Sequence, residues 1–140
     1  MRGRKIPMST LIPASEWLYA YYGKMGYATV FDYTPEHYTV LEKPVADHFR
    51  VEAIRDEELL TDDVFHYFQS MMRLRPCCVQ HERDDFEVIV ESLRMDGGAL
   101  IVVYSDRNIV GMAFAEPQGN HVLIQDGMYD SDDVKQVALE

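Results

Sequence analysis

Cys77, Cys78 and His81 are the side chains whose types and spacing come closest to those of a metal site. Thiolate and imidazole groups are the ligands that zinc prefers, and a structural zinc site takes four of them. Only three stand here, two of them adjacent, and no further Cys-x-x-Cys pair or histidine cluster supplies the fourth. We therefore expect no metal in this protein.

Four carboxylates lie close together near the end of the chain, at positions 126, 130, 132 and 133. They lack the central glycine and the closing glutamate of a calcium-binding loop, so we interpret them as caps of a final helix, where they favour the helix dipole. None of the other histidines has a serine or cysteine at the spacing of a catalytic triad (positions 37, 48, 66 and 121). No P-loop or dinucleotide-binding fingerprint is present in the sequence.

The first part of the sequence predicts a strand, a helix and a hairpin. Residues 9–13 read as a short buried strand that ends at a proline. Ser15 is a good N-cap for a helix that Gly26 ends, because glycine adopts the left-handed conformation readily. Two β-rich runs follow, over 28–33 and 38–41, on either side of a proline turn.

The rest of the sequence predicts a longer series of elements. A strand over 49–54 is followed by two helices with apolar faces, over 56–73 and 82–95. Apolar runs separated by turns then predict a meander of strands over 99–104, 109–115 and 121–125, and a last helix over 134–139. The pattern predicts an α/β (α+β) fold with a mixed, mainly antiparallel sheet flanked by helices.

The seven residues from Tyr21 to Tyr27 read Tyr-Tyr-Gly-Lys-Met-Gly-Tyr. This ending of a helix, preceded by a strand and followed by a hairpin, resembles the closing motif of the GNAT family of acetyl-CoA-dependent N-acetyltransferases. The resemblance implies an acyl-CoA N-acyltransferase-like fold. It also implies that Tyr22 is the general acid that protonates the departing thiolate of coenzyme A, since a phenol stays protonated at neutral pH. Ser15 falls on the helix-start position that faces the pantetheine arm of the cofactor. As alternatives, Tyr22 is simply a core aromatic of its helix and Ser15 an ordinary N-cap.

Residues 49–139 resemble the opening half of a second such module by the order and length of their elements. In the family, a Gln/Arg-x-x-Gly-x-Gly/Ala loop comes next and holds the pyrophosphate of acetyl-CoA at a helix N-terminus. Residues 125–133 stand at that place, but their glycine spacing differs and their aspartates would repel a pyrophosphate. We therefore expect a poor cofactor loop in this part.

The resemblance divides the chain near position 46, with residues 43–47 as the connector. Residues 1–46 are interpreted as the end of a first module (strand, helix and hairpin) and residues 47–140 as the start of a second. The net charge also differs, at +1 for the first part and −12 for the second. The first strand begins within ten residues of Met1, and the final helix stops after barely two turns. We expect both modules to be partial, and to dock as one compact domain or to complement each other in a homodimer.

The charge, the apolar runs and the cysteines of the sequence exclude some classes of partner and location. The formal charge of −11 over 140 residues predicts no nucleic-acid partner. The longest apolar run, residues 99–104, is far shorter than the ~18 residues of a membrane span, and no apolar segment of a secretion signal follows the basic residues at the start. A disulfide between the adjacent cysteines would need a distorted peptide, so we expect reduced thiols and a cytoplasmic location.

The function implied by the resemblance is transfer of an acetyl group from acetyl-CoA to a primary amine of a small molecule or peptide. An acidic surface would attract a cationic amine at long range. The candidate general base is a carboxylate such as Glu116 or Asp126, acting through water. Two other interpretations stay open: a non-catalytic GNAT-like interaction or structural module without a working cofactor loop, and a metal-binding regulator.

Overall fold

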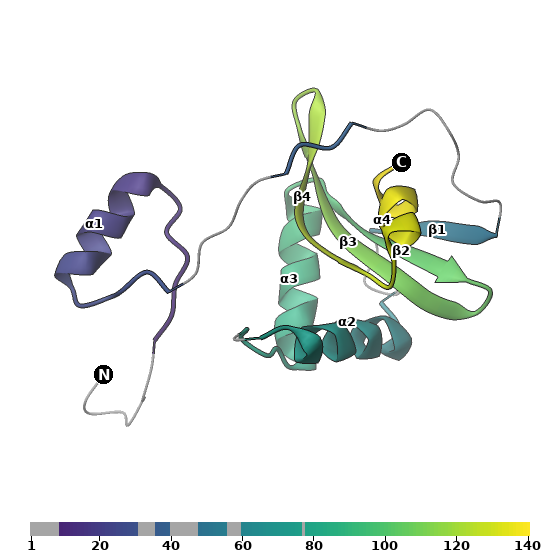
Figure 1. The fold of residues 1–140 in the computed structure, drawn as a ribbon, viewed down its shortest axis with the longest axis horizontal. Coiled ribbons are helices and arrows are strands. Elements are labelled where there is room, and N and C mark those ends of the chain that lie inside the picture. The colour runs from purple at the N-terminus through teal and green to yellow at the C-terminus, as the bar shows by residue number, and fades with distance from the viewer. Residues whose placement is uncertain (1–8, 31–35, 40–47, 56–59, 77) are drawn as a thin grey trace. The chain divides into compact units, whose positions relative to one another are not determined.

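The computed structural model describes residues 9–30, 36–39, 48–55, 60–76 and 78–140. The chain divides into two compact units, Met1–Tyr38 and Thr39–Glu140, and each is described by itself (Figure 1). The connector that we expected over 43–47 lies outside the described residues.

The first unit contains helix α1, Glu16–Lys24. Ser15 is its N-cap residue, as predicted, and Gly26 follows the helix at φ 92°, the left-handed conformation that the sequence predicted for it. No residue of α1 is buried: Trp17 is 67% exposed and Tyr21 is 46% exposed. The helix therefore forms where its caps predict, while its aromatic side chains stay in contact with solvent.

The strand predicted over 9–13 is wrong, because these residues have no regular structure and Ile12 is 90% exposed. Residues 28–30 and 38–39 likewise form no strand, and the other residues of the predicted hairpin lie outside the described part. A strand needs a neighbour for its backbone hydrogen bonds, whereas a helix satisfies its own. In the described residues of this unit no strand lies beside them, so only the helix forms.

The second unit is built on a four-stranded antiparallel sheet in the order β1-β2-β3-β4. Its strands are β1 (Phe49–Ile54), β2 (Ala99–Ser105), β3 (Asn108–Gln118) and β4 (His121–Tyr129). Every pair of neighbours among the described strands is antiparallel, so the mixed sheet that we expected is antiparallel throughout this part. The register shifts between Phe114 and Ala115, which leaves Gln125 as a bulged residue of β4.

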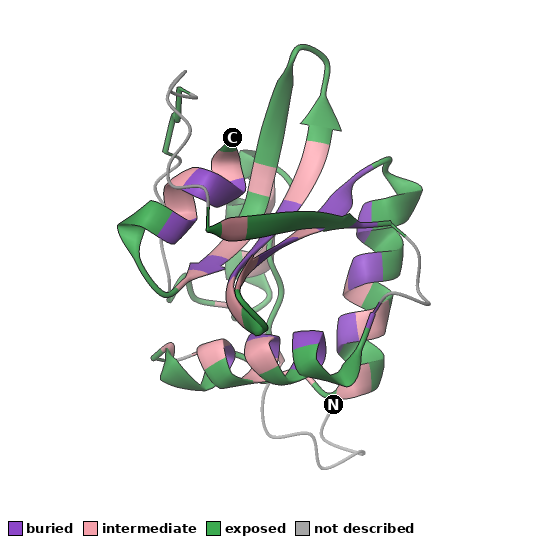
Figure 2. Cartoon of the chain, turned by 90° about the vertical axis from the view of Figure 1, so that its right-hand side faces the viewer, coloured by how far each residue is buried: buried purple, intermediate pink, exposed green. Residues whose placement is uncertain are grey.

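Three helices cover the two faces of this sheet (Figure 2). Helices α2 (Asp62–Leu74) and α3 (Arg83–Met95) pack on one face, and α4 (Asp132–Leu139) packs on the other. The larger core joins the predicted apolar faces of α2 and α3 to the sheet, with Phe86 fully buried against Phe68 at 4.5 Å between ring centroids. The smaller core joins Val134 and Val137 of α4 to Val103. The described fold is thus mixed α and β.

Several predicted boundaries move. The helix expected from residue 56 begins at Asp62, after the N-cap Thr61, and residues 56–59 lie outside the described part. Strand β4 continues four residues beyond the predicted end at Gln125, because it stays paired with β3 as far as Tyr129. The turn before it narrows to Gly119 and Asn120, and Gly119 takes φ 63°, which favours glycine.

Candidate functional site

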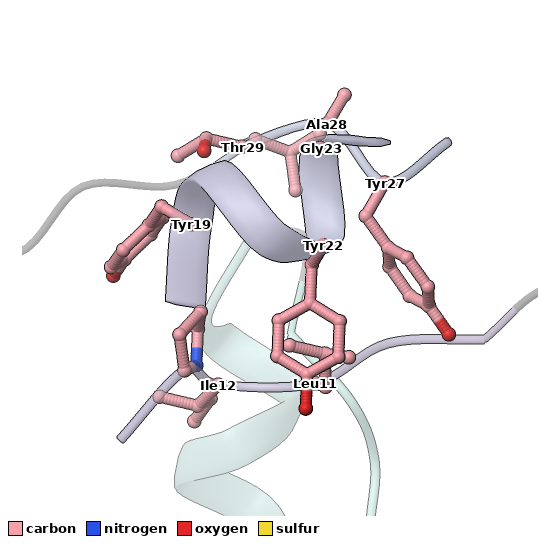
Figure 3. A pocket seen from close by; sticks show the side chains of 10 residues that line it. Leu11, Ile12, Tyr19, Tyr22, Gly23, Tyr27, Ala28 and Thr29 are labelled. Carbon is pink, nitrogen blue, oxygen red and sulfur yellow. The ribbon is translucent and has the colours of Figure 1, made fainter. Parts of the chain in front are cut away.

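Tyr22 lines an open pocket of about 270 Å³ in the first unit. The walls come from α1 and from the segments before and after it; the lining residues are Leu11, Ile12, Pro13, Tyr19, Tyr22, Gly23, Tyr27, Ala28, Thr29 and Val30. Figure 3 shows the ring of Tyr22 projecting from the helix toward the segment that carries Leu11. The pocket is mainly apolar, and three phenol groups border it.

The ring of Tyr22 is held by aromatic neighbours. It meets Tyr27 edge-on at 5.7 Å and Tyr21 edge-on at 5.3 Å between ring centroids. Such edge-to-face contacts orient a ring. The hydroxyl of Tyr27 is 3.0 Å from the hydroxyl oxygen of Ser9, which ties the segment before the helix to the segment after it. Tyr22 is thus half-buried, with a fixed ring beside an apolar cavity.

Ser15 lies apart from this pocket. It is exposed, it occupies the N-cap position of α1, and its side chain makes no capping hydrogen bond. The described pocket therefore includes Tyr22 and excludes Ser15. Sequence reasoning did not single out Tyr19 and Tyr27 as lining residues. Tyr27 closes the same motif and Tyr19 lies one helical turn before Tyr22, so helical spacing could have found both.

The connection from β4 to α4 stands where the resemblance places a pyrophosphate loop. Ser131 already caps the helix, since its hydroxyl oxygen accepts a hydrogen bond from the backbone N–H of Val134 at 3.3 Å. Asp132 and Asp133 occupy the first turn of α4. The N–H of Val134 is therefore not available to a phosphate. The two carboxylates beside the other free N–H groups of the first turn would repel an anion. These residues do not fit a pyrophosphate.

The aspartates that we expected to cap the final helix do so only in part. Asp130 instead accepts a hydrogen bond from the hydroxyl of Tyr67 at 3.0 Å. Burial, and then this bond to a carboxylate, raise the pKa of Tyr67 well above its usual range. The capping prediction is wrong for Asp126 and Asp130, because Arg75 binds the first carboxylate and Tyr67 binds the second.

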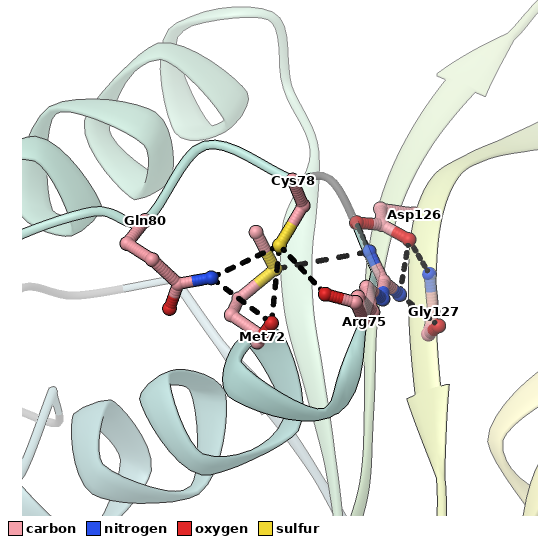
Figure 4. Close-up of polar contacts among 6 residues, drawn as sticks. All are labelled: Met72, Arg75, Cys78, Gln80, Asp126 and Gly127. Carbon is pink, nitrogen blue, oxygen red and sulfur yellow. Dashed lines mark hydrogen bonds and ion pairs between the residues drawn. The ribbon is translucent and has the colours of Figure 1, made fainter. Parts of the chain in front are cut away.

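Asp126 lies in β4 and pairs with Arg75, just after α2, at 2.7 and 2.9 Å (Figure 4). The hydrogen bond from Arg75 to this carboxylate raises the pKa of the guanidinium further. Glu116, the other candidate general base, accepts a hydrogen bond from Gln125. Both carboxylates thus have neighbours that compete for the oxygens a catalytic water would need.

Of the three candidate zinc ligands, Cys77 lies outside the described residues. The thiol of Cys78 donates to the carbonyl oxygen of Met72 at 3.0 Å and packs against the larger core. Within the part of the chain that the structure describes, no group of three or more His, Cys, Asp or Glu side chains is arranged to hold a metal ion.

None of the described helices combines the length and the apolar character needed to cross a bilayer. Searches of protein-family models, curated proteins and solved structures give no match to this chain.

Proposed function

We propose that this chain is an acetyltransferase-like protein that transfers an acetyl group from acetyl-CoA to a primary amine, with an acyl-CoA N-acyltransferase-like fold. The observation that carries the proposal is the position of Tyr22 beside an apolar pocket, as the second residue of the motif Tyr-Tyr-Gly-Lys-Met-Gly-Tyr. The hydroxyl of Tyr22 is beside this cavity, and phenols as a class suit proton donation to a thiolate because their ordinary pKa is near 10.

The element order of the second unit supports the same proposal. A strand, two helices, a three-strand meander and a helix follow one another from β1 to α4. This is the order that the resemblance implies for the opening half of a module.

In this proposal the amine nitrogen bonds to the acetyl carbon, the C–S bond breaks, and the hydroxyl of Tyr22 gives its proton to the sulfur of the leaving thiolate. The proton that the nitrogen loses passes to water, and a proton from water restores the hydroxyl of Tyr22. The apolar side chains around the pocket reduce the access of water to the thioester. Because the start of α4 does not fit a pyrophosphate, we assign no step to that end of the second unit.

Calorimetry with acetyl-CoA tests the proposal, together with an assay of thiol release in the presence of primary amines. We expect binding with a Kd of micromolar order, and thiol release that falls about 100-fold or more in Tyr22→Phe. Tyr21→Phe is the matched control, because Tyr21 is a neighbour on α1 that does not line the pocket. Equal thiol release from Tyr22→Phe and the unchanged chain would refute the role of Tyr22.

A second candidate function is a non-catalytic interaction or structural module. The helix cap at Ser131 and the carboxylates of Asp132 and Asp133 favour it, because they oppose phosphate binding. For this candidate, acetyl-CoA at millimolar concentration would give no heat of binding, while the fold of the second unit would be intact by circular dichroism.

A further inference from the structure

Strand β4 lies at an edge of the described sheet, with β3 as its neighbour on one side. An exposed edge strand offers unpaired N–H and C=O groups to another chain, and proteins protect such edges with charges, prolines or covering groups. The other edge strand, β1, has six residues and carries the ion pair of Arg50 and Glu52. Strand β4 has nine residues and contains no lysine, arginine or proline. Its side chains include Val122, 60% exposed, and Leu123, 41% exposed.

Along β4, the backbone N–H and C=O groups of successive residues point alternately toward β3 and toward the open side of the sheet. The backbone N–H of Asp130, directly after β4, donates to the carbonyl oxygen of Val110 in β3. Alternation then directs the backbone groups of Met128 and Asp126 toward β3 and those of Gly127 toward the open side. Gly127 therefore presents its N–H and C=O where a further strand would pair.

Both of these groups are taken by the side chains of one ion pair (Figure 4). The N–H of Gly127 donates to the Oδ1 atom of Asp126 at 2.7 Å. The carbonyl oxygen of Gly127 accepts a hydrogen bond from the guanidinium of Arg75 at 2.9 Å. The same guanidinium holds both oxygens of the Asp126 carboxylate. A strand could pair with Gly127 only by displacing these bonds.

We propose that the pair of Arg75 and Asp126 is an edge lock that prevents β4 from pairing with β4 of a second copy of this chain. An antiparallel pairing of two such edges would join the two sheets about a two-fold axis and cover Val122 and Leu123. The lock takes the place of the lysine, arginine and proline residues that β4 lacks. This inference does not depend on the proposed acetyltransferase function, since it concerns assembly alone.

The test removes the lock and measures mass in solution. Arg75→Gln takes away the bonds to Asp126 and Gly127, and Arg83→Gln is the matched control, since Arg83 forms ion pairs with Asp62 and Glu87 away from β4. By light scattering after size exclusion, we expect the mass of Arg75→Gln to rise with concentration toward twice that of the unchanged chain. The control should keep the mass of the unchanged chain.

A second substitution separates strand pairing from aggregation of unfolded chains. Leu123→Lys places a charge on the edge, so the double variant with Arg75→Gln should return to the mass of the unchanged chain. A folded Arg75→Gln whose mass does not rise would overturn the proposal. So would association that Leu123→Lys fails to reverse, because unfolding would then be its cause.

Discussion

Arg75 and Asp126 are joined by two hydrogen bonds, of 2.7 and 2.9 Å, across 51 positions of the sequence. The pair ties the end of α2 to β4 and so fixes one end of that helix on the sheet. Both side chains are partly exposed, at 35% and 43%, so solvent screens the attraction between them. The contact contributes to the fold mainly through its geometry. Arg75 binds both oxygens of the Asp126 carboxylate and also the carbonyl oxygen of Gly127, so it orients the backbone of β4.

Tyr67 should make the stability of the second unit sensitive to alkaline pH. Its pKa is raised in the folded chain, chiefly by burial and then by the bond to Asp130, whereas in the unfolded chain it is near 10. A raised pKa contributes stability that is complete below the unfolded value and is lost as the pH rises above it. Between about pH 9 and 11, urea denaturation should show a larger loss of stability for the unchanged chain than for Tyr67→Phe. If the free energy of unfolding falls equally with pH for both chains, this assignment is contradicted. The control is Tyr19→Phe, in the other unit, which should behave like the unchanged chain.

Elements whose structure depends on nearby residues could be predicted from the sequence. Helix α3 begins one residue after the predicted start, because Glu82 becomes its N-cap in a capping box with Asp85. The apolar faces of α2 and α3 are buried where their spacing placed them. Helical periodicity and caps depend only on residues within a short stretch of chain. These predictions therefore do not require knowledge of the tertiary structure.

What depends on distant partners could not be predicted. The strand over 9–13 is wrong because strand propensity gives no pairing partner. The aspartates looked like one cluster in the sequence, but Arg75 and Tyr67 separate two of them from the start of α4. The site shows the same limit: Tyr22 was found from its motif, while the pocket around it is formed by side chains that only the folded unit brings together.

Phe86 is the side chain on which the larger core should depend most. It is fully buried, and its ring lies 4.5 Å from that of Phe68 and 6.4 Å from that of Phe114. Phe86→Ala should lower the free energy of unfolding by about 3–5 kcal/mol, because the cavity cannot close. Val88→Ala, on the same helix but 63% exposed, should change it by about 0.5 kcal/mol or less. Chemical denaturation of both variants checks this, and equal effects would show that the core is not packed as described.

Gly111 allows α4 to approach the sheet. A Cβ atom at this position would overlap the Cγ1 atom of Val134 and lie 3.4 Å from the Cβ atom of Val103. Gly111→Ala should therefore cost about 1–3 kcal/mol of stability, as overpacking of a core does. The double variant with Val134→Ala should recover part of this loss, because it removes the overlapping methyl group. If the double variant is less stable than Gly111→Ala alone, α4 is not held in the way described.

Acetyl-CoA should bind beside Tyr22, and ¹H–¹⁵N NMR of the full chain during a titration with acetyl-CoA measures this binding residue by residue. We expect saturable shifts of the backbone amides of Tyr22, Gly23 and Tyr27, which line the pocket, and no comparable shifts at Ser131 and Asp132, where carboxylates oppose phosphate. Unchanged amides around Tyr22 at millimolar acetyl-CoA, or shifts confined to the start of α4, would contradict the claim.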